Sequence, residues 1–258
     1  MVTIKSDREV KLMREACKTA LKVQQELEKN IKPGISTKQL DEIAEKTITR
    51  LGAIPAQKNY PSIYDDVADF PATICVSVND EVIHGIPSKK KILKNGDLVS
   101  IDLVVCQNGF HGDCARTYLV GNVDEKAKKL VEVTKQAFFE GIKFAKKGNR
   151  LGDMSHAIGN FIEKNGFSVV KEFQGHGIGR QMHEEPGIPN NGKPNKGIKL
   201  LPGMTLAVEP MVILGKPGVV ELEDGWTIVT EDGSLSAHYE NTILITENQP
   251  EILTIWKV

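Results

Sequence analysis

Apolar residues recur at helical spacing near the start of the chain. Ser6 is followed three residues later by Glu9, a capping-box pattern typical of the first turn of a helix. The apolar positions of this predicted helix are Val10, Met13, Cys17 and Leu21. We expect it to end before Pro33-Gly34, because these residues interrupt helices.

A second helix and three strands are predicted in the first half of the chain. Ser36 with Gln39 repeats the capping pattern, and apolar residues continue through Ile48 until Gly52 ends the helix. Apolar and β-branched runs then follow at 73–78, 98–106 and 110–120. We interpret these runs as strands.

The same order of elements is predicted again from Asp124 onward. One helix extends to about Gly148, and another extends from about Leu151 to Gly166. Strand-like runs follow at 167–173, 204–213, 226–230 and 242–246.

An offset of 114 residues aligns Gly34 with Gly148 and Gly52 with Gly166, at the ends of the predicted helices. Repetition of a whole order of elements indicates an internal repeat. We therefore expect a single domain over residues 1–258, built from two α+β halves of about 1–121 and 122–258 that share a curved sheet with helices outside. A site at the joint between such halves would draw residues from both.

Composition and charge exclude several classes of protein. Hydrophobic residues make up 40% of the chain and charged residues 26%, as in water-soluble globular proteins. The formal net charge is −1, so no overall field attracts nucleic acid or a membrane surface. The sequence predicts neither a signal peptide nor a membrane span, and a cytoplasmic monomer is expected. The four cysteines are widely spaced and predict neither a disulfide framework nor a structural zinc site; Cys17 and Cys106 are expected to be buried free thiols.

Several acidic residues stand where the pattern predicts buried strands. Asp102 lies in the run 98–105, Glu209 in the run 204–211, and Glu240 directly before the run 241–245. For any one of these acids, an edge-strand position or pairing with a basic residue is as good an explanation as a functional role. Together with Asp113 they outnumber the basic residues inside apolar runs, and unpaired buried carboxylates are costly. Divalent cations would satisfy all four acids together.

Three histidines adjoin glycine or proline at predicted junctions between strands and turns. These are His84 before Gly85, His176 between Gly175 and Gly177, and His183 three residues before Pro186. Catalytic residues are commonly held at such junctions. The other three histidines, His111, His156 and His238, are interpreted as surface or packing residues.

Four carboxylates with one imidazole form an oxygen-rich set that two divalent ions would neutralise. Two such ions can hold a bridging hydroxide and polarise a carbonyl group, so the residues favour a two-metal hydrolase without naming its substrate.

The chain resembles the methionine aminopeptidases of the short bacterial type (type I) over almost its whole length. The matching segments are 81–87 (EVIHGIP), 96–102 (GDLVSID), 112–117 (GDCART), 175–186 (GHGIGRQMHEEP), 202–210, 224–226 and 239–240. The resemblance implies the pita-bread fold, which is α+β with a curved antiparallel sheet and outer helices. It also implies removal of N-terminal methionine from nascent proteins, with a small second residue preferred.

The resemblance further implies roles for individual residues. Asp102 would bind one metal ion, Asp113 and Glu240 would bridge both ions, and His176 with Glu209 would bind the second. Glu209 would handle the proton of the attacking water. His183 would stabilise the tetrahedral intermediate, and His84 would contact the substrate at the scissile bond. Two divalent metal ions are expected. Their element would be Co, Mn, Fe or Zn, and the ligand set does not select among these four.

By the same resemblance, Cys75, Phe70 and Trp226 would form the methionine pocket, although each is also explained as an ordinary core residue. Asn79, Glu81 and Ser236 match a monovalent-cation site of the family. The segment between Tyr60 and Phe70 aligns poorly, and Met182 replaces an aromatic residue of many relatives. Nascent N-termini are the expected partners, and contact with the ribosome follows from the function alone.

Two other functions stay open at this point. Proline-specific peptidases (prolidase and aminopeptidase P) use similar metal ligands, but usually carry a further N-terminal domain. Non-catalytic binding modules of the same fold have broken ligand sets, whereas all five positions stand here. The segment 187–201 either shapes the substrate entrance or is a plain solvated connection.

Overall fold

The helices of the chain begin where the sequence predicts. The computed structural model describes residues 2–255. Its helices within that range are α1 (Asp7–Glu28), α2 (Thr37–Arg50), α3 (Glu125–Ile142) and α4 (Leu151–Lys164). The Ser6 and Ser36 side chains accept hydrogen bonds from the backbone N–H groups of Glu9 and Gln39, and both capping boxes are complete. The predicted starts of α1 and α2 are therefore confirmed.

The turn after each of these helices contains a glycine with a positive φ angle. Gly34 and Gly148 have φ angles of +93° and +87°, and Gly52 and Gly166 have φ angles of +74° and +83°. These left-handed conformations are disfavoured for residues with a Cβ atom. The offset of 114 residues that relates the two glycine pairs also carries α2 onto α4 at both ends.

The first half of the chain contributes one four-stranded sheet. Its strands are β1 (Ile54–Pro55), β2 (Cys75–Val78), β4 (Leu98–Gln107) and β5 (Phe110–Leu119), and β3 (Glu81–Ile83) joins another sheet. β4 and β5 pair over ten residues on one edge of β4. β1 and β2 pair end to end along the other edge of β4. The order β1–β4–β2 with β5 on β4 makes β4 the centre of this sheet.

The second half is richer in short strands than the sequence predicts. They are β6 (Ser168–Val169), β7 (Gln174–Gly177), β8 (Glu184–Pro189), β9 (Thr205–Val208), β10 (Met211–Ile213), β11 (Val219–Glu221), β12 (Ile228–Thr230), β13 (Ser236–His238), β14 (Asn241–Leu244) and β15 (Glu251–Ile252). The strand predicted over 204–213 is broken at Glu209-Pro210, because proline has no N–H for a ladder. The strand predicted over 167–173 is limited to β6.

Within residues 2–255 all paired strands are antiparallel, and hydrogen bonding divides them into four sheets. The two larger sheets meet where β5 lies against β14. There the Thr242 hydroxyl donates to the Asp113 carbonyl (2.9 Å) and accepts from the Asp113 N–H (3.2 Å). The Glu240 N–H donates to the carbonyl of Ala115 (3.0 Å). This β5–β14 seam joins residues more than a hundred positions apart.

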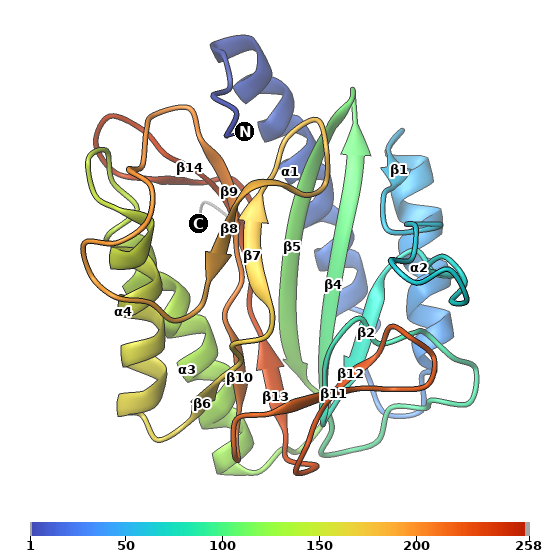
Figure 1. Cartoon of the computed structure of the whole chain (residues 1–258). Helices are drawn as coiled ribbons and strands as arrows, with labels where there is room; N and C mark the ends of the chain where they lie inside the picture. The colour runs from blue at the N-terminus through green and yellow to red at the C-terminus, as the bar shows by residue number, and fades with distance from the viewer. Residues whose placement is uncertain (1, 256–258) are drawn as a thin grey trace.

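Helices cover the strands of each half, as Figure 1 shows, with α1 and α2 beside the first half and α3 and α4 beside the second. Leu27, Leu40 and Ile48 from the first pair of helices are fully buried against β2, β4 and β5. Phe138 of α3 is fully buried with α4 and the C-terminal strands. Each half thus has its own core, which holds its strands fixed at the seam.

Two further observations bear on the sequence predictions. Cys17 is buried as expected, but the expectation for Cys106 is wrong, because its position near the end of β4 leaves it half-buried. No helix within residues 2–255 combines the length and apolar character needed to cross a membrane.

Candidate metal centre

Two of the predicted ligands come from the β4–β5 hairpin. Asp102 pairs with Ala115 across the hairpin, and Asp113 pairs with Val104, so the two acids are two residues apart along the ladder. Residues two apart point to the same face of a sheet. Asp113 is 3% exposed, and the Thr242 hydroxyl holds its backbone on both sides.

The other three predicted ligands come from the sheet on the far side of the seam. His176 lies on β7 opposite Ala207 of β9. Glu209 follows directly after β9, and Glu240 directly before β14. Since Asn241 pairs with Val208, the two glutamates stand at the next position of the same ladder. The break in the predicted strand at Pro210 is therefore what ends the ladder beside Glu209.

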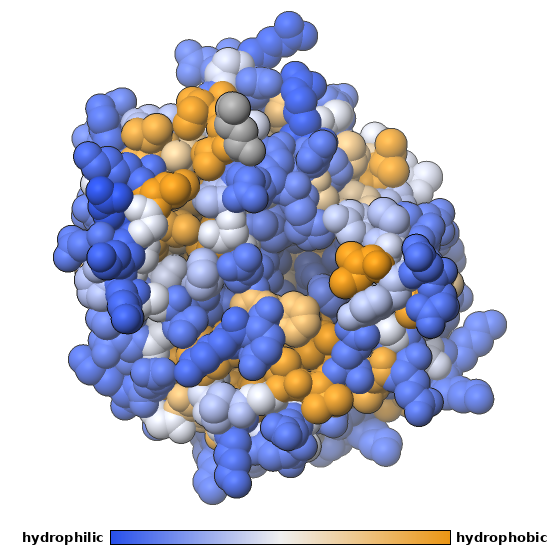
Figure 2. All heavy atoms as spheres, viewed as in Figure 1, coloured by the Kyte–Doolittle hydropathy of each residue, from blue (hydrophilic) through white to orange (hydrophobic). Residues whose placement is uncertain are grey.

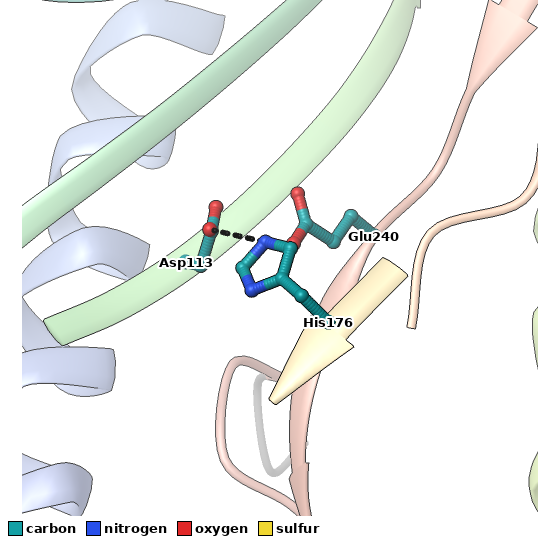
Figure 3. A group of neighbouring side chains, drawn as sticks. All are labelled: Asp113, His176 and Glu240. Carbon is teal, nitrogen blue, oxygen red and sulfur yellow. Dashed lines mark ion pairs between the residues drawn. The ribbon is translucent and has the colours of Figure 1, made fainter. Parts of the chain in front are cut away.

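The five side chains converge across the seam. His176 Nε2 lies 3.7 Å from Asp113 Oδ2 and 3.6 Å from Glu209 Oε1. Asp113, His176 and Glu240 each offer one ligand atom within a span of 4.8 Å. Figure 3 shows these three side chains turned toward one another from β5, β7 and the segment before β14. Such a spacing between donor atoms suits a cation bound among them.

Burial of these acids disfavours their charged forms. It raises the pKa of Asp102 to about 6 and that of Glu209 to about 8, and it raises the pKa values of Asp113 and Glu240 well above their usual range. Among the described residues, three of their oxygens are buried without a hydrogen-bond partner: Asp102 Oδ1, Asp113 Oδ1 and Glu240 Oε1. Carboxyl groups buried in this state are stabilised by a proton or by a cation.

The tautomer of His176 is fixed by the hydrogen bond at its Nδ1 atom. Its Nδ1 lies 2.9 Å from the carbonyl of Gly177, which can only accept, so Nδ1 carries the proton. Burial lowers the pKa of His176 to about 4, so the ring is neutral at pH 7. Nε2 therefore presents a lone pair to the acids, as a metal-binding histidine does.

His183 is oriented by Tyr60, a residue that the sequence did not single out. Tyr60 Oη lies 2.6 Å from His183 Nδ1, and burial raises the pKa of the phenol. A phenol can donate or accept, and in the tautomer in which Tyr60 donates to Nδ1 the proton of the neutral imidazole is on Nε2. The rings of His183 and His176 are 4.4 Å apart between centroids. His183 thus offers an N–H donor beside the acids.

His84 is held in a strained backbone conformation. Its φ angle of +57° is in the left-handed region, which is uncommon outside glycine. Its ring makes edge contacts with Phe173 and Trp226, at centroid distances of 6.0 Å and 6.4 Å. Burial lowers its pKa to about 4, so it too is neutral at pH 7.

A cavity of about 810 Å³ opens onto the five predicted ligands. All ten predicted site residues lie on its wall: Phe70, Cys75, His84, Asp102, Asp113, His176, His183, Glu209, Trp226 and Glu240. Phe70, Ala72 and Cys75 form a small buried cluster against which Trp226 packs. Figure 2 shows the surface hollowed near the middle of the view, with hydrophobic residues gathered beside the hollow. The cavity thus has a carboxylate-lined part and an apolar part.

The sequence interpretation missed residues at this site. His238 was interpreted as a surface or packing residue, but it is 2% exposed and its Nε2 lies 3.5 Å from Glu209 Oε2. The burial of His238 fits a packing residue, and its contact with Glu209 was not predicted, because no motif marks it. His111 and His156 bond to backbone carbonyls of Gly179 and Gly192. Gln57 donates to the carboxylate of Asp102, and no motif marked it.

The three residues expected at a monovalent-cation site lie together. The Ser236 hydroxyl donates to the backbone carbonyls of Asn79 (3.1 Å) and Glu81 (2.9 Å). The Glu81 carboxylate is paired with Lys91. Binding of a cation at these oxygens stays a prediction. Of the segment 187–201, Gly187 lines the cavity.

Comparisons with known proteins agree with this geometry. The model of metallopeptidase family M24 matches residues 11–247. Methionine aminopeptidase of Clostridium perfringens is 51% identical over 257 residues, which is 100% of both chains. The crystal structure of methionine aminopeptidase from Thermotoga maritima superposes with a TM-score of 0.95 at 45% identity, over 99% of this chain and 100% of that one. A prolidase from Pyrococcus furiosus has a TM-score of 0.79 at 23% identity, over 99% of this chain and 66% of that one, which is a likeness of fold alone.

Proposed function

The chain belongs to metallopeptidase family M24. Within this family, we propose that it is a methionine aminopeptidase. It hydrolyses the first peptide bond of polypeptides that begin with methionine. The relatives that share its full length carry this name, and its pita-bread fold is theirs. Newly made proteins with a small second residue are the proposed substrates.

The observation that carries the proposal is the set of unpartnered carboxylate oxygens around His176. Asp113 Oδ1 and Glu240 Oε1 are buried beside a histidine nitrogen whose lone pair is free, and Asp102 Oδ1 is buried on the wall of the same cavity. This donor set fits divalent transition metals, and it lacks the thiolates of a structural zinc site. Asp102 would hold one ion, His176 with Glu209 would hold the other, and Asp113 and Glu240 would contribute to holding both. The ions Co, Mn, Fe and Zn all suit these ligands.

When bound there, two divalent ions supply Lewis-acid polarisation of the scissile carbonyl and lower the pKa of water. The Glu209 carboxylate would take the proton of the attacking water, because it lines the cavity and its Oε1 lies 3.6 Å from Nε2 of the proposed ligand His176. The buried His238 beside its other oxygen limits how the carboxylate can turn.

Two neutral histidines act on the substrate. His183 donates its Nε2–H to the carbonyl oxygen, which gains negative charge in the tetrahedral intermediate, and the hydrogen bond from Tyr60 keeps the proton on that nitrogen. His84 contacts the nitrogen side of the scissile bond, and its strained backbone and aromatic neighbours hold the ring in place.

The apolar part of the cavity receives the methionine side chain. Phe70 and Trp226 meet at a centroid distance of 5.2 Å, and Cys75 lies beside them. Aromatic edges and sulfur atoms form favourable contacts with a thioether. Contact with the ribosome and a monomeric state stay predictions.

The proposal is tested by stripping the purified protein with a chelator and reloading it separately with Mn, Fe, Co or Zn. The substrates are Met-Ala-Ser, Met-Leu-Ser and an X-Pro peptide. We expect metal-restored release of methionine from Met-Ala-Ser, and much slower release from Met-Leu-Ser. Cleavage confined to the X-Pro peptide would instead assign the chain to the proline-specific peptidases of the same fold.

A further inference from the structure

Gln57 occupies a gap between two strands that share an edge of β4. β1 pairs with β4 up to Pro55, opposite Val105, and the Ala56 N–H donates to the carbonyl of Val104 (3.0 Å). β2 begins at Cys75, opposite Asp102. Gln57 therefore follows at the gap beside Leu103, between the ends of β1 and β2, and its side chain reaches Asp102. It is 7% exposed and lines the cavity.

The amide of Gln57 links a predicted metal ligand to the wall of the methionine pocket. Its Nε2 donates to Asp102 Oδ2 at 3.2 Å and lies 3.5 Å from Cys75 Sγ. A carboxylate can only accept while it is ionised, so the NH₂ group must face Asp102. Within residues 2–255, this is the one side-chain hydrogen bond found at the Asp102 carboxylate.

The other predicted ligands are oriented by different means. The backbone of Asp113 is held by Thr242, and the ring of His176 by the carbonyl of Gly177. The backbone of Asp102 is held by its pairing with β2 and β5, and among the described residues only Gln57 donates to its carboxylate and so fixes the rotation of that group. With Oδ2 engaged by the amide, Oδ1 is the atom left unpartnered. Partners of this kind commonly change metal affinity by about 10- to 100-fold when removed.

A neutral donor suits this position better than a charged one. The cluster already contains four acids, and a lysine or arginine would neutralise Asp102 and compete with a metal ion for it. An amide orients the carboxylate without removing its charge. Gln57 Oε1 is itself buried without a partner among the described residues, so the contact with Asp102 is kept at a cost.

We propose that Gln57 is a positioning residue that orients Asp102 for the metal ion that this aspartate binds, and so sets the affinity of that one ion. The inference rests on the proposed function only for the presence of the metals. It concerns one ion of the two, since Gln57 touches none of Asp113, His176, Glu209 or Glu240 in the bonds described.

The test replaces Gln57 with methionine, which keeps the length of the side chain but has no donor. Co²⁺ or Mn²⁺ is titrated calorimetrically into chelator-stripped protein, and the visible spectrum of the Co²⁺ form is recorded. We expect Gln57→Met to weaken one of two binding events by roughly 10- to 100-fold, to leave the other within about twofold, and to change the Co²⁺ spectrum. We also expect kcat to fall more than KM rises at limiting metal concentration.

Gln24→Met is the matched control. Gln24 of α1 is also buried, and its Nε2 donates to the backbone carbonyls of Ile101 and Cys114, the neighbours of Asp102 and Asp113. Its loss perturbs the same two strands without touching a carboxylate. We expect Gln24→Met to lower stability while both metal affinities and the Co²⁺ spectrum stay as in the unaltered chain.

Gln57→Asn gives a second variant should Gln57→Met fail to fold, because it keeps a polar amide but withdraws it by one methylene group. Unchanged affinities in either folded Gln57 variant, or an equal loss in Gln24→Met, would overturn the inference. These results are separate from those for the proposed function. If the unaltered chain binds two ions and releases no methionine, the function is wrong, whereas the role of Gln57 is still decided by the titrations.

Discussion

The buried carboxylates predict how the stability of the metal-free protein depends on pH. Burial raises the pKa of Glu209 to about 8 and the pKa values of Asp113 and Glu240 well above their usual range. An exposed glutamate has a pKa of about 4.3. In the absence of metal, the folded chain therefore holds protons that the unfolded chain has released. The stability that depends on these protons is lost as the pH rises toward and through the folded pKa values.

The pH interval must separate these acids from the histidines. Burial lowers the pKa values of His176, His238 and His84 to about 4, below the value of about 6.5 for an exposed histidine. The stability that these neutral histidines confer is present above pH 6.5 and is lost as the pH falls. Between pH 6.5 and 8.0 the carboxylates therefore dominate. For Glu209 alone, a pKa of about 8 gives a loss of roughly 2 kcal/mol over this interval.

The assay is reversible urea unfolding of chelator-treated protein at pH 6.5 and at pH 8.0. We expect the free energy of unfolding to be lower at pH 8.0 by about 2 kcal/mol or more, since Asp113 and Glu240 act in the same direction. Glu209→Gln should reduce the difference, because the amide does not titrate. Saturating divalent metal should reverse the trend, since metal ions bind deprotonated ligands.

A metal-free protein as stable at pH 8.0 as at pH 6.5 would refute this reasoning. So would an equal pH dependence in Glu209→Gln.

Three further variants have expected outcomes. Tyr60→Phe removes the hydrogen bond that holds the His183 tautomer, and we expect kcat for Met-Ala-Ser to fall by roughly tenfold with unchanged metal binding, as measured by steady-state kinetics and titration. Wild-type kcat in that variant would exclude this role. Trp226→Ala should raise KM for the same peptide by about tenfold, since loss of ~1–1.5 kcal/mol of aromatic contact corresponds to that factor; an equal KM would place the methionine side chain elsewhere. Phe138→Ala should lower the free energy of unfolding by about 3–5 kcal/mol, because Phe138 is fully buried in the core of the second half, and a loss below 1 kcal/mol would contradict that packing.

The helices were the most predictable part of the fold. Ser6 and Ser36 carry their own start signals, and Gly34 and Gly52 have the positive φ angles that their positions suggested. These signals are local, so the sequence contains them in full. The short strands were less predictable, because β9 and β10 share one apolar run and are separated only by Glu209-Pro210.

The acids of the site could be found because each lies in or directly beside a run that reads as a strand. Their partners could not, since Gln57, Tyr60 and His238 have no motif, and their roles depend on contacts with Asp102, His183 and Glu209. Gln57 and Asp102 are brought together by the end-to-end placement of β1 and β2, which no local pattern records. The half-buried state of Cys106 likewise depends on where β4 ends.

The central claim is that five residues from both sides of the β5–β14 seam bind two divalent metal ions. Anomalous diffraction from crystals soaked in Mn²⁺ tests it most directly. We expect two peaks in the cavity, one in contact with Asp102, the other in contact with His176 and Glu209, and both in contact with Asp113 and Glu240. Crystals that give no peak within reach of His176, or peaks only on the outer surface, would contradict the account.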